Sequence, residues 1–104
     1  MAEKKNNLIV KLDELEGRLV EIENQLSDPQ IAGTPARLVA LSKEQGKLRN
    51  IVGKYRDYKK TLAHMADARA IAHDASADAD FRSLAEAEAA ELESKSSRLL
   101  EEIR

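Results

Sequence analysis

The fold is decided by residues 8–26, which read LIVKLDELEGRLVEIENQL. Large aliphatic side chains recur in this stretch at alternating steps of four and three residues: Leu8, Leu12, Leu15, Leu19, Ile22 and Leu26. This spacing places them on one narrow face of a helix, the pattern of a helix that packs against other helices. The sequence therefore predicts a first helix over about residues 6–26, with Asn6 or Asn7 as its N-cap and an ion pair between Glu14 and Arg18.

A second helix is predicted over about residues 35–74. Ser27-Asp28-Pro29 ends the first helix because proline cannot continue the hydrogen-bond ladder. After a loop, Thr34-Pro35 offers a cap and a first-turn proline for the next helix. Near Tyr58 the apolar spacing shortens, which is typical of a stammer in the repeat. The predicted stripe is Leu38, Leu41, Leu48, Val52 and Tyr55, followed by Tyr58, Leu62 and Met65.

A turn is predicted at residues 74–78, where several Asp and Ser side chains can cap and no apolar residue exceeds alanine in size. The third helix is then expected over about residues 79–104, with a sparser stripe: Phe81, Leu84, Ala85, Leu92, Leu99 and Ile103. Short connections make consecutive helices antiparallel neighbours. The predicted fold is all-α, a single domain of residues 1–104 forming an elongated antiparallel three-helix bundle or helical hairpin with one long central helix.

Composition argues against catalysis and against cofactor or metal binding. The chain has no Cys and only four scattered Gly, so neither a thiolate metal site nor a phosphate-binding glycine loop is expected. His64 and His73 are nine residues apart, which on one helix places them on opposite sides. No signal peptide and no long apolar run is visible. We expect a cytoplasmic protein that is not an enzyme, with no catalytic residues, no cofactor, no membrane contact and no small-molecule substrate.

The net charge is only −2, but it is unevenly distributed. Residues 35–69 carry nine bases and three acids, whereas residues 78–104 carry eight acids and four bases. Attraction between packed neighbours is the simpler interpretation. Within the basic middle, Lys43, Lys47, Asn50 and Lys54 share one helix face. An ordinary solvated face explains them, and the alternative is a set of contacts to RNA phosphates through Lys43, Lys47 and Lys54.

Several strings, in order along nearly the whole chain, carry a family resemblance. They are Leu26-Ser27-Asp28-Pro29, then residues 38–44 (LVALSKE), residues 51–59 (IVGKYRDYK) and Asp78-Ala79-Asp80-Phe81 followed by Leu84-Ala85 and Glu88. Together they resemble the N-terminal domain of the bacterial class I peptide chain release factors. Ser27-Asp28-Pro29 favours the release factor 1 group over the release factor 2 group, and Ala79 departs from a common proline.

The resemblance implies that the intact protein terminates translation at UAA and UAG codons. The family's Gly-Gly-Gln loop and its codon-reading tripeptide do not occur in these residues, so the chain looks like an excised domain with both beyond Arg104. For this domain the resemblance implies contact with the stalk base of the ribosome and coupling to release factor 3. Contact roles for the three lysines are our own hypothesis and not a family motif.

Two other classes of function stay open from the sequence. A generic coiled-coil adaptor would pair its leucine stripe with a second copy, and it would sediment as a dimer. A small helical chaperone would clamp unfolded clients, and it would suppress their aggregation.

Overall fold

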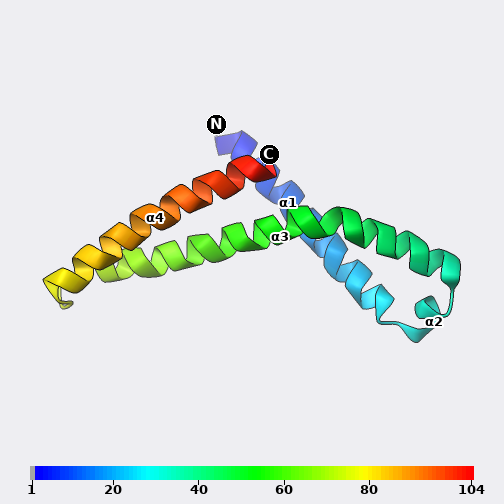
Figure 1. The fold of residues 1–104 in the computed structure, drawn as a ribbon. Coiled ribbons are helices and arrows are strands. Elements are labelled where there is room, and N and C mark those ends of the chain that lie inside the picture. The colour runs from blue at the N-terminus through cyan, green and yellow to red at the C-terminus, as the bar shows by residue number, and fades with distance from the viewer. Residues whose placement is uncertain (1) are drawn as a thin grey trace. The chain divides into compact units, whose positions relative to one another are not determined.

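The computed structural model describes the backbone of residues 2–104 and the side chains of residues 5–104 (Figure 1). The fold is all-α as predicted, and the described backbone contains no strand. The helices are α1 (Ala2–Leu26), α2 (Pro29–Ala32), α3 (Pro35–Ala72) and α4 (Ala79–Ile103). The chain forms two compact units, Met1–Gly53 and Lys54–Arg104, called here the N-terminal and C-terminal units. Helix α3 contributes to both units.

The N-terminal unit is held by large aliphatic side chains. Ile22 of α1, Ile31 of α2 and Leu41 of α3 form one buried cluster, with Leu26 and Leu48 packed against it. The predicted stripe of α1 is confirmed, because Leu12, Leu19 and Ile22 are each at most 4% exposed. Burying such side chains stabilises the unit by about 1.5–3 kcal/mol each.

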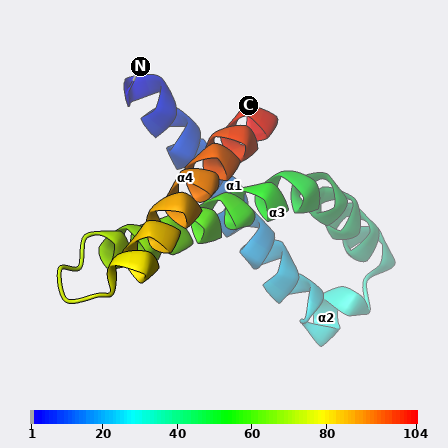
Figure 2. The ribbon, with the colours of Figure 1, turned by 60° about the vertical axis from the view of Figure 1, so that its left-hand side comes forward.

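The ends of the helices in this unit differ in detail from the prediction. Helix α1 begins at Ala2, so Asn6 and Asn7 lie inside it and neither is its N-cap. Residues 29–32, expected to be loop, form the single turn α2 at the connection of α1 and α3 (Figure 2). The Asp28 side chain caps this turn by accepting from the Gln30 amide at 3.0 Å, and Pro29 occupies its first position. The apolar periodicity of the sequence could not predict α2, because a helix of four residues is too short to show a repeat.

The C-terminal unit is a helical hairpin in which α4 returns along the second half of α3 (Figure 1). Buried residues of α3 follow at Tyr55, Tyr58, Thr61, Met65 and Ala68, and those of α4 are Ala85, Ala89, Ser96, Leu99 and Ile103. The two successive steps of three residues from Tyr55 to Thr61 confirm the stammer. Thr61 takes the buried position expected for Leu62, and its hydroxyl donates to the Asp57 carbonyl at 2.8 Å.

The turn at residues 74–78 is confirmed, and its two aspartates organise it. Asp74 accepts from the amide and the hydroxyl of Ser76, and Asp78 accepts from the Asp80 amide at the start of α4. The predicted stripe of α4 was wrong at its beginning, because Phe81 is 56% exposed and Leu84 is 69% exposed. The buried positions of α4 instead follow the four-and-three repeat through Ala85 and Ala89. Position along the repeat, and not side-chain size, decides which residues of α4 are buried.

Candidate functional site

The lysines singled out from the sequence lie on α3 with different environments. Lys43, Lys47 and Asn50 are exposed in the N-terminal unit. Lys54 is half-buried and belongs to the C-terminal unit. The charge of Lys47 also contributes to lowering the pKa of the neighbouring Glu44 carboxyl. Lys43 and Lys47 are therefore more exposed to an anionic partner than Lys54.

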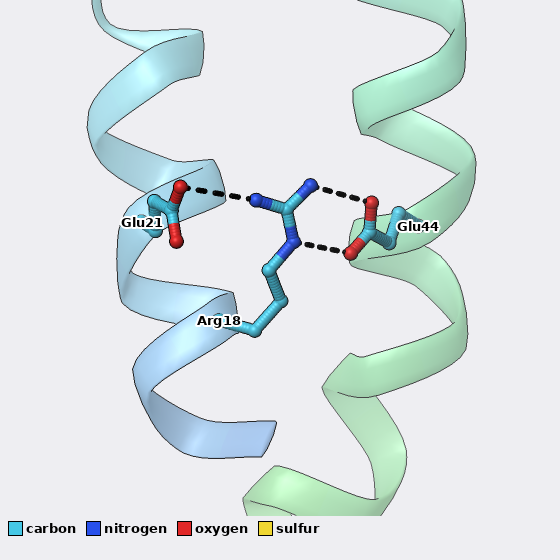
Figure 3. Close-up of polar contacts among 3 residues, drawn as sticks. All are labelled: Arg18, Glu21 and Glu44. Atoms are coloured by element: carbon cyan, nitrogen blue, oxygen red, sulfur yellow. Dashed lines mark hydrogen bonds and ion pairs between the residues drawn. The ribbon is translucent and has the colours of Figure 1, made fainter. Parts of the chain in front are cut away.

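Beside these lysines, a guanidinium joins α1 to α3 inside the N-terminal unit (Figure 3). Arg18 Nε and Nη2 donate to the two oxygens of Glu44, the second bond measuring 2.8 Å, and Nη1 lies 3.2 Å from Glu21 Oε1. All three guanidinium nitrogens therefore interact with a carboxylate. The prediction that Arg18 pairs with Glu14 was wrong, because its partners are Glu44 and Glu21. A bidentate arginine–carboxylate pair fixes geometry as well as charge, so it sets the register between the helices.

The hydrogen bonds of this pair shift the titration of both groups. They raise the pKa of Arg18 and lower the pKa of Glu44 from its ordinary 4.5, with the opposite charge of Arg18 adding to the second effect. The pair is accessible to water, with side-chain exposures of 36% and 39%. At this exposure the pair contributes little free energy, and its main effect is on how α1 faces α3.

The C-terminal unit carries a groove that the sequence did not reveal. It is lined by His64, Asp67, Ala68 and Ile71 of α3 and by Glu88 of α4, with a volume of about 310 Å³. It is open to water and has both carboxylate and apolar walls. The spacing of residues in the sequence could not predict this groove, because its lining residues come from two helices. Which sides of α3 and α4 face each other is determined only when the hairpin folds.

On α4, two exposed apolar side chains precede Glu88, which lines this groove. Leu84 lies one helical turn before Glu88, and Phe81 lies a further three residues back, so the three share one face. Phe81 and Leu84 are among the most exposed large apolar residues of the described chain. The groove and these two side chains together, called here the α4 face, make a mixed apolar and acidic surface.

His64 reaches this groove, and His73 lies at the start of the turn after α3. Among the described side chains, no group of three or more His, Asp or Glu residues is arranged to hold a metal ion. No described helix is long and apolar enough to cross a membrane. The described surface has exposed lysines on α3, and the C-terminal unit has a groove with apolar and acidic walls.

Comparison with known proteins gives a consistent family assignment. The PCRF domain family matches residues 15–104. Over 88 residues the chain is 40% identical to peptide chain release factor 1 of Alkaliphilus oremlandii, covering 85% of this chain and 25% of that protein. It is 36% identical over 94 residues to peptide chain release factor 1 of Levilactobacillus brevis, covering 90% of this chain and 26% of the relative.

Peptide chain release factor 1 of Streptococcus sanguinis is 40% identical over 73 residues, which cover 70% of this chain and 20% of that protein. No solved structure matches the chain. The chain thus spans about a quarter of the length of the Alkaliphilus and Levilactobacillus relatives. The match to the PCRF domain extends over most of the chain, from α1 through α4, and the chain therefore belongs to this family of release factor domains.

Proposed function

We propose that the chain is the N-terminal domain of a peptide chain release factor that acts in the cytoplasm in translation termination at UAA and UAG stop codons. Its role is to bind and position, by contacting the stalk base of the ribosome and coupling to release factor 3. The observation that carries the proposal is the PCRF domain match over residues 15–104, together with relatives named peptide chain release factor 1.

The proposal assigns no catalytic step to this chain. The chain covers only 25% of the Alkaliphilus relative, and stop-codon reading and peptidyl-tRNA hydrolysis are assigned to the remainder of such a protein. What this chain supplies is a pair of helical units with contact faces on their surfaces. Each unit has its own buried core, so its exposed side chains are held in a defined geometry.

The proposal is tested by binding the chain to 70S ribosomes stalled at a UAA codon and at a sense codon. We expect equal affinity for both complexes, because codon reading is assigned elsewhere, and competition with intact release factor 1. We also expect no release of peptide from the stalled complex. Absence of ribosome binding, or binding that intact release factor 1 does not displace, would contradict the proposal.

Within this function, Lys43, Lys47 and Lys54 are proposed to contact ribosomal RNA. Neutralised phosphates release counterions, so removing one lysine–phosphate pair should flatten the slope of log affinity against log salt by about 0.7–0.9. Changing all three lysines to glutamate should therefore weaken ribosome binding strongly at low salt and reduce that slope by about 2–3 units. Circular dichroism checks that the helices remain.

A matched control changes Lys5 and Lys11, exposed lysines of α1, to glutamate. This control alters the net charge by four units, against six for the triple variant, so it reports the effect of overall charge alone. Lys43 and Lys47 are also changed without Lys54, since Lys54 is half-buried and belongs to the other unit. If the control weakens binding in proportion to its charge, the lysine face has no specific contact.

Two measurements separate this function from the remaining alternatives. Sedimentation at micromolar concentration should give a monomer, whereas a coiled-coil adaptor should give a dimer. The chain should not suppress aggregation of an unfolded client protein, which a chaperone would do.

A further inference from the structure

Two glycines lie on the exposed side of α3 although nothing within the chain requires glycine there. Gly46 and Gly53 are inside this helix, where glycine is less favourable than every other residue except proline. Neither has a positive φ angle, and a Cβ atom at either position would meet nothing within 4 Å. Neither backbone conformation nor internal packing therefore explains these glycines. A glycine in such a position allows a partner to approach the helix backbone closely.

The residues around Gly46 form a face with a cation on each side. Residues seven apart on a helix lie almost directly above one another, so Val39, Gly46 and Gly53 form a central row. The neighbouring rows place Arg49 on one side of Gly46 and Lys43 on the other. This surface, called here the Gly46 face, consists of seven exposed residues of the N-terminal unit: Val39, Ser42, Lys43, Gly46, Arg49, Asn50 and Gly53.

Positive charge dominates this part of α3. Residues 35–53 contain four bases and one acid. The acid, Glu44, accepts two hydrogen bonds from the Arg18 guanidinium, so its charge is compensated within the unit. The Gly46 face contains no acid, and its Ser42 and Asn50 can donate hydrogen bonds to phosphate oxygens. The charge and the donors of this face are therefore complementary to a phosphate backbone.

Gly17 of α1 offers a comparison within the same unit. A Cβ atom at this position would also meet nothing within 4 Å. Its neighbours on the exposed side of α1 are Asp13 and Glu21, which would repel phosphates. The combination of an accessible glycine with flanking cations, and not the glycine alone, therefore distinguishes the Gly46 face.

We propose that the Gly46 face binds the sugar–phosphate backbone of RNA at close range, with the strand passing over Gly46 between Lys43 and Arg49. Each of these two cations holds a phosphate, and the missing side chain at position 46 lets the strand lie against the helix. The inference adds Arg49 and the close approach at Gly46 to the lysine contacts, and it does not include Lys54 of the other unit. The choice of RNA as the phosphate-bearing partner rests on the proposed function, whereas the place of contact rests on the face itself.

The variant Gly46→Leu should change stability and binding in opposite directions. Leucine is a better helix former than glycine, so the urea midpoint of the chain should rise. The new side chain occupies the path of the strand and holds phosphates away from both cations, so affinity for 70S ribosomes should fall at least about tenfold. Misfolding cannot produce this combination. The matched control Gly17→Leu should also raise the urea midpoint, but it should leave ribosome affinity unchanged.

The variant Arg49→Ala tests the cation that the lysine contacts leave out. Removing one phosphate contact should reduce the slope of log affinity against log salt by about 0.7–0.9. Its control is Arg37→Ala, because Arg37 is an exposed base nine residues before Gly46 and therefore lies on the opposite side of α3. The control should leave the slope unchanged. Equal slopes for the two variants would contradict a contact through Arg49.

Photocrosslinking from position 39 identifies the class of partner. Val39 is 53% exposed in the central row of the face, and it is replaced by p-benzoylphenylalanine before the chain is bound to 70S ribosomes. We expect a crosslink to ribosomal RNA that the added Gly46→Leu change abolishes. The same probe at Val10 of α1, which is 56% exposed, should give no crosslink to that RNA. A crosslink from position 39 to a ribosomal protein, to release factor 3 or to a second copy of this chain would overturn the inference.

The outcome distinguishes this inference from the proposed function. If the wild-type chain binds ribosomes but Gly46→Leu and Arg49→Ala bind with unchanged affinity and salt slope, the Gly46 face is not an RNA contact and the proposed function stands. If the wild-type chain does not bind ribosomes at all, the proposed function is overturned and the RNA partner with it.

Discussion

The two units of this chain differ in the types of side chain that form their buried cores. The N-terminal unit buries leucine and isoleucine, including Leu12, Leu19 and Ile22, and adds a bidentate ion pair. The C-terminal unit buries alanines and the hydroxyl-bearing Thr61 and Ser96 together with five larger residues: Tyr55, Tyr58, Met65, Leu99 and Ile103. Burial of a large apolar side chain contributes more stabilising free energy, whereas small side chains allow two helices to approach closely. The comparison shows that the N-terminal unit is stabilised mainly by burial of aliphatic side chains, whereas the first half of α4 packs through small side chains while Phe81 and Leu84 stay exposed.

The largest effect is expected in the aliphatic core. Ile22→Ala removes a side chain that is 0% exposed, and it should lower the free energy of unfolding by about 2–5 kcal/mol through reduced burial and a cavity. The free energy of unfolding is measured by urea titration with circular dichroism as the signal. Val20→Ala, at a position 44% exposed on the same helix, should change stability by no more than about 0.5 kcal/mol. Equal effects at both positions would mean that α1 does not bury this face.

The opposite change tests the closely packed core of the C-terminal unit. Ala89→Leu inserts a large side chain at a position 8% exposed, and overpacking should destabilise the chain by about 1–3 kcal/mol. Ala90→Leu, at the adjacent exposed position, serves as its control in the same urea titration. A more stable Ala89→Leu variant would show that the alanine seam leaves unfilled space.

Helix capping provides a smaller test. Asp78→Ala removes the side chain that accepts from the Asp80 amide at the start of the long helix α4, at a cost of about 1 kcal/mol. Asp28→Ala removes the equivalent cap from α2, which has only four residues. We expect thermal unfolding to show the larger destabilisation for Asp78. A larger effect for Asp28 would assign the single turn α2 a greater role in closing the N-terminal unit.

The smallest effect concerns acid stability. Hydrogen bonds lower the pKa of Glu44 below 4.5 and the pKa of Asp74 below 3.8. A carboxyl with a lowered pKa stabilises the folded state fully above its ordinary pKa, and this contribution is lost as the pH falls through the folded value. Glu44→Gln should therefore flatten the fall in stability below about pH 4.5, and Asp74→Asn should flatten the fall below about pH 3.8. Urea midpoints measured from pH 7 to pH 3 test this, and an unchanged pH profile for either variant would contradict its assigned pairing.

Much of the fold was predictable, and the errors have a common cause. The leucine spacing predicted α1 and the start of α3, and the stammer at Tyr58 was visible in the sequence. The periodicity predicted Ala85, Leu99 and Ile103 of α4 correctly, but it missed Ala89 and Ser96, because alanine and serine carry a weak hydrophobic signal. Phe81 and Leu84 were assigned to the core for their size, and the groove beside them was missed because its lining residues come from α3 and α4 together.

By itself the sequence determined the fold class, the approximate helices and the turn at residues 74–78, since these depend on local propensity, capping and the periodicity of one helix at a time. Only the tertiary structure decided that Arg18 pairs with Glu44, and not with Glu14, and that Ala89 is buried while Phe81 and Leu84 face water. The physical reason is that burial and ion pairing are properties of two helices facing each other. Each helix shows a stripe, but the partner helix determines where the contact is made.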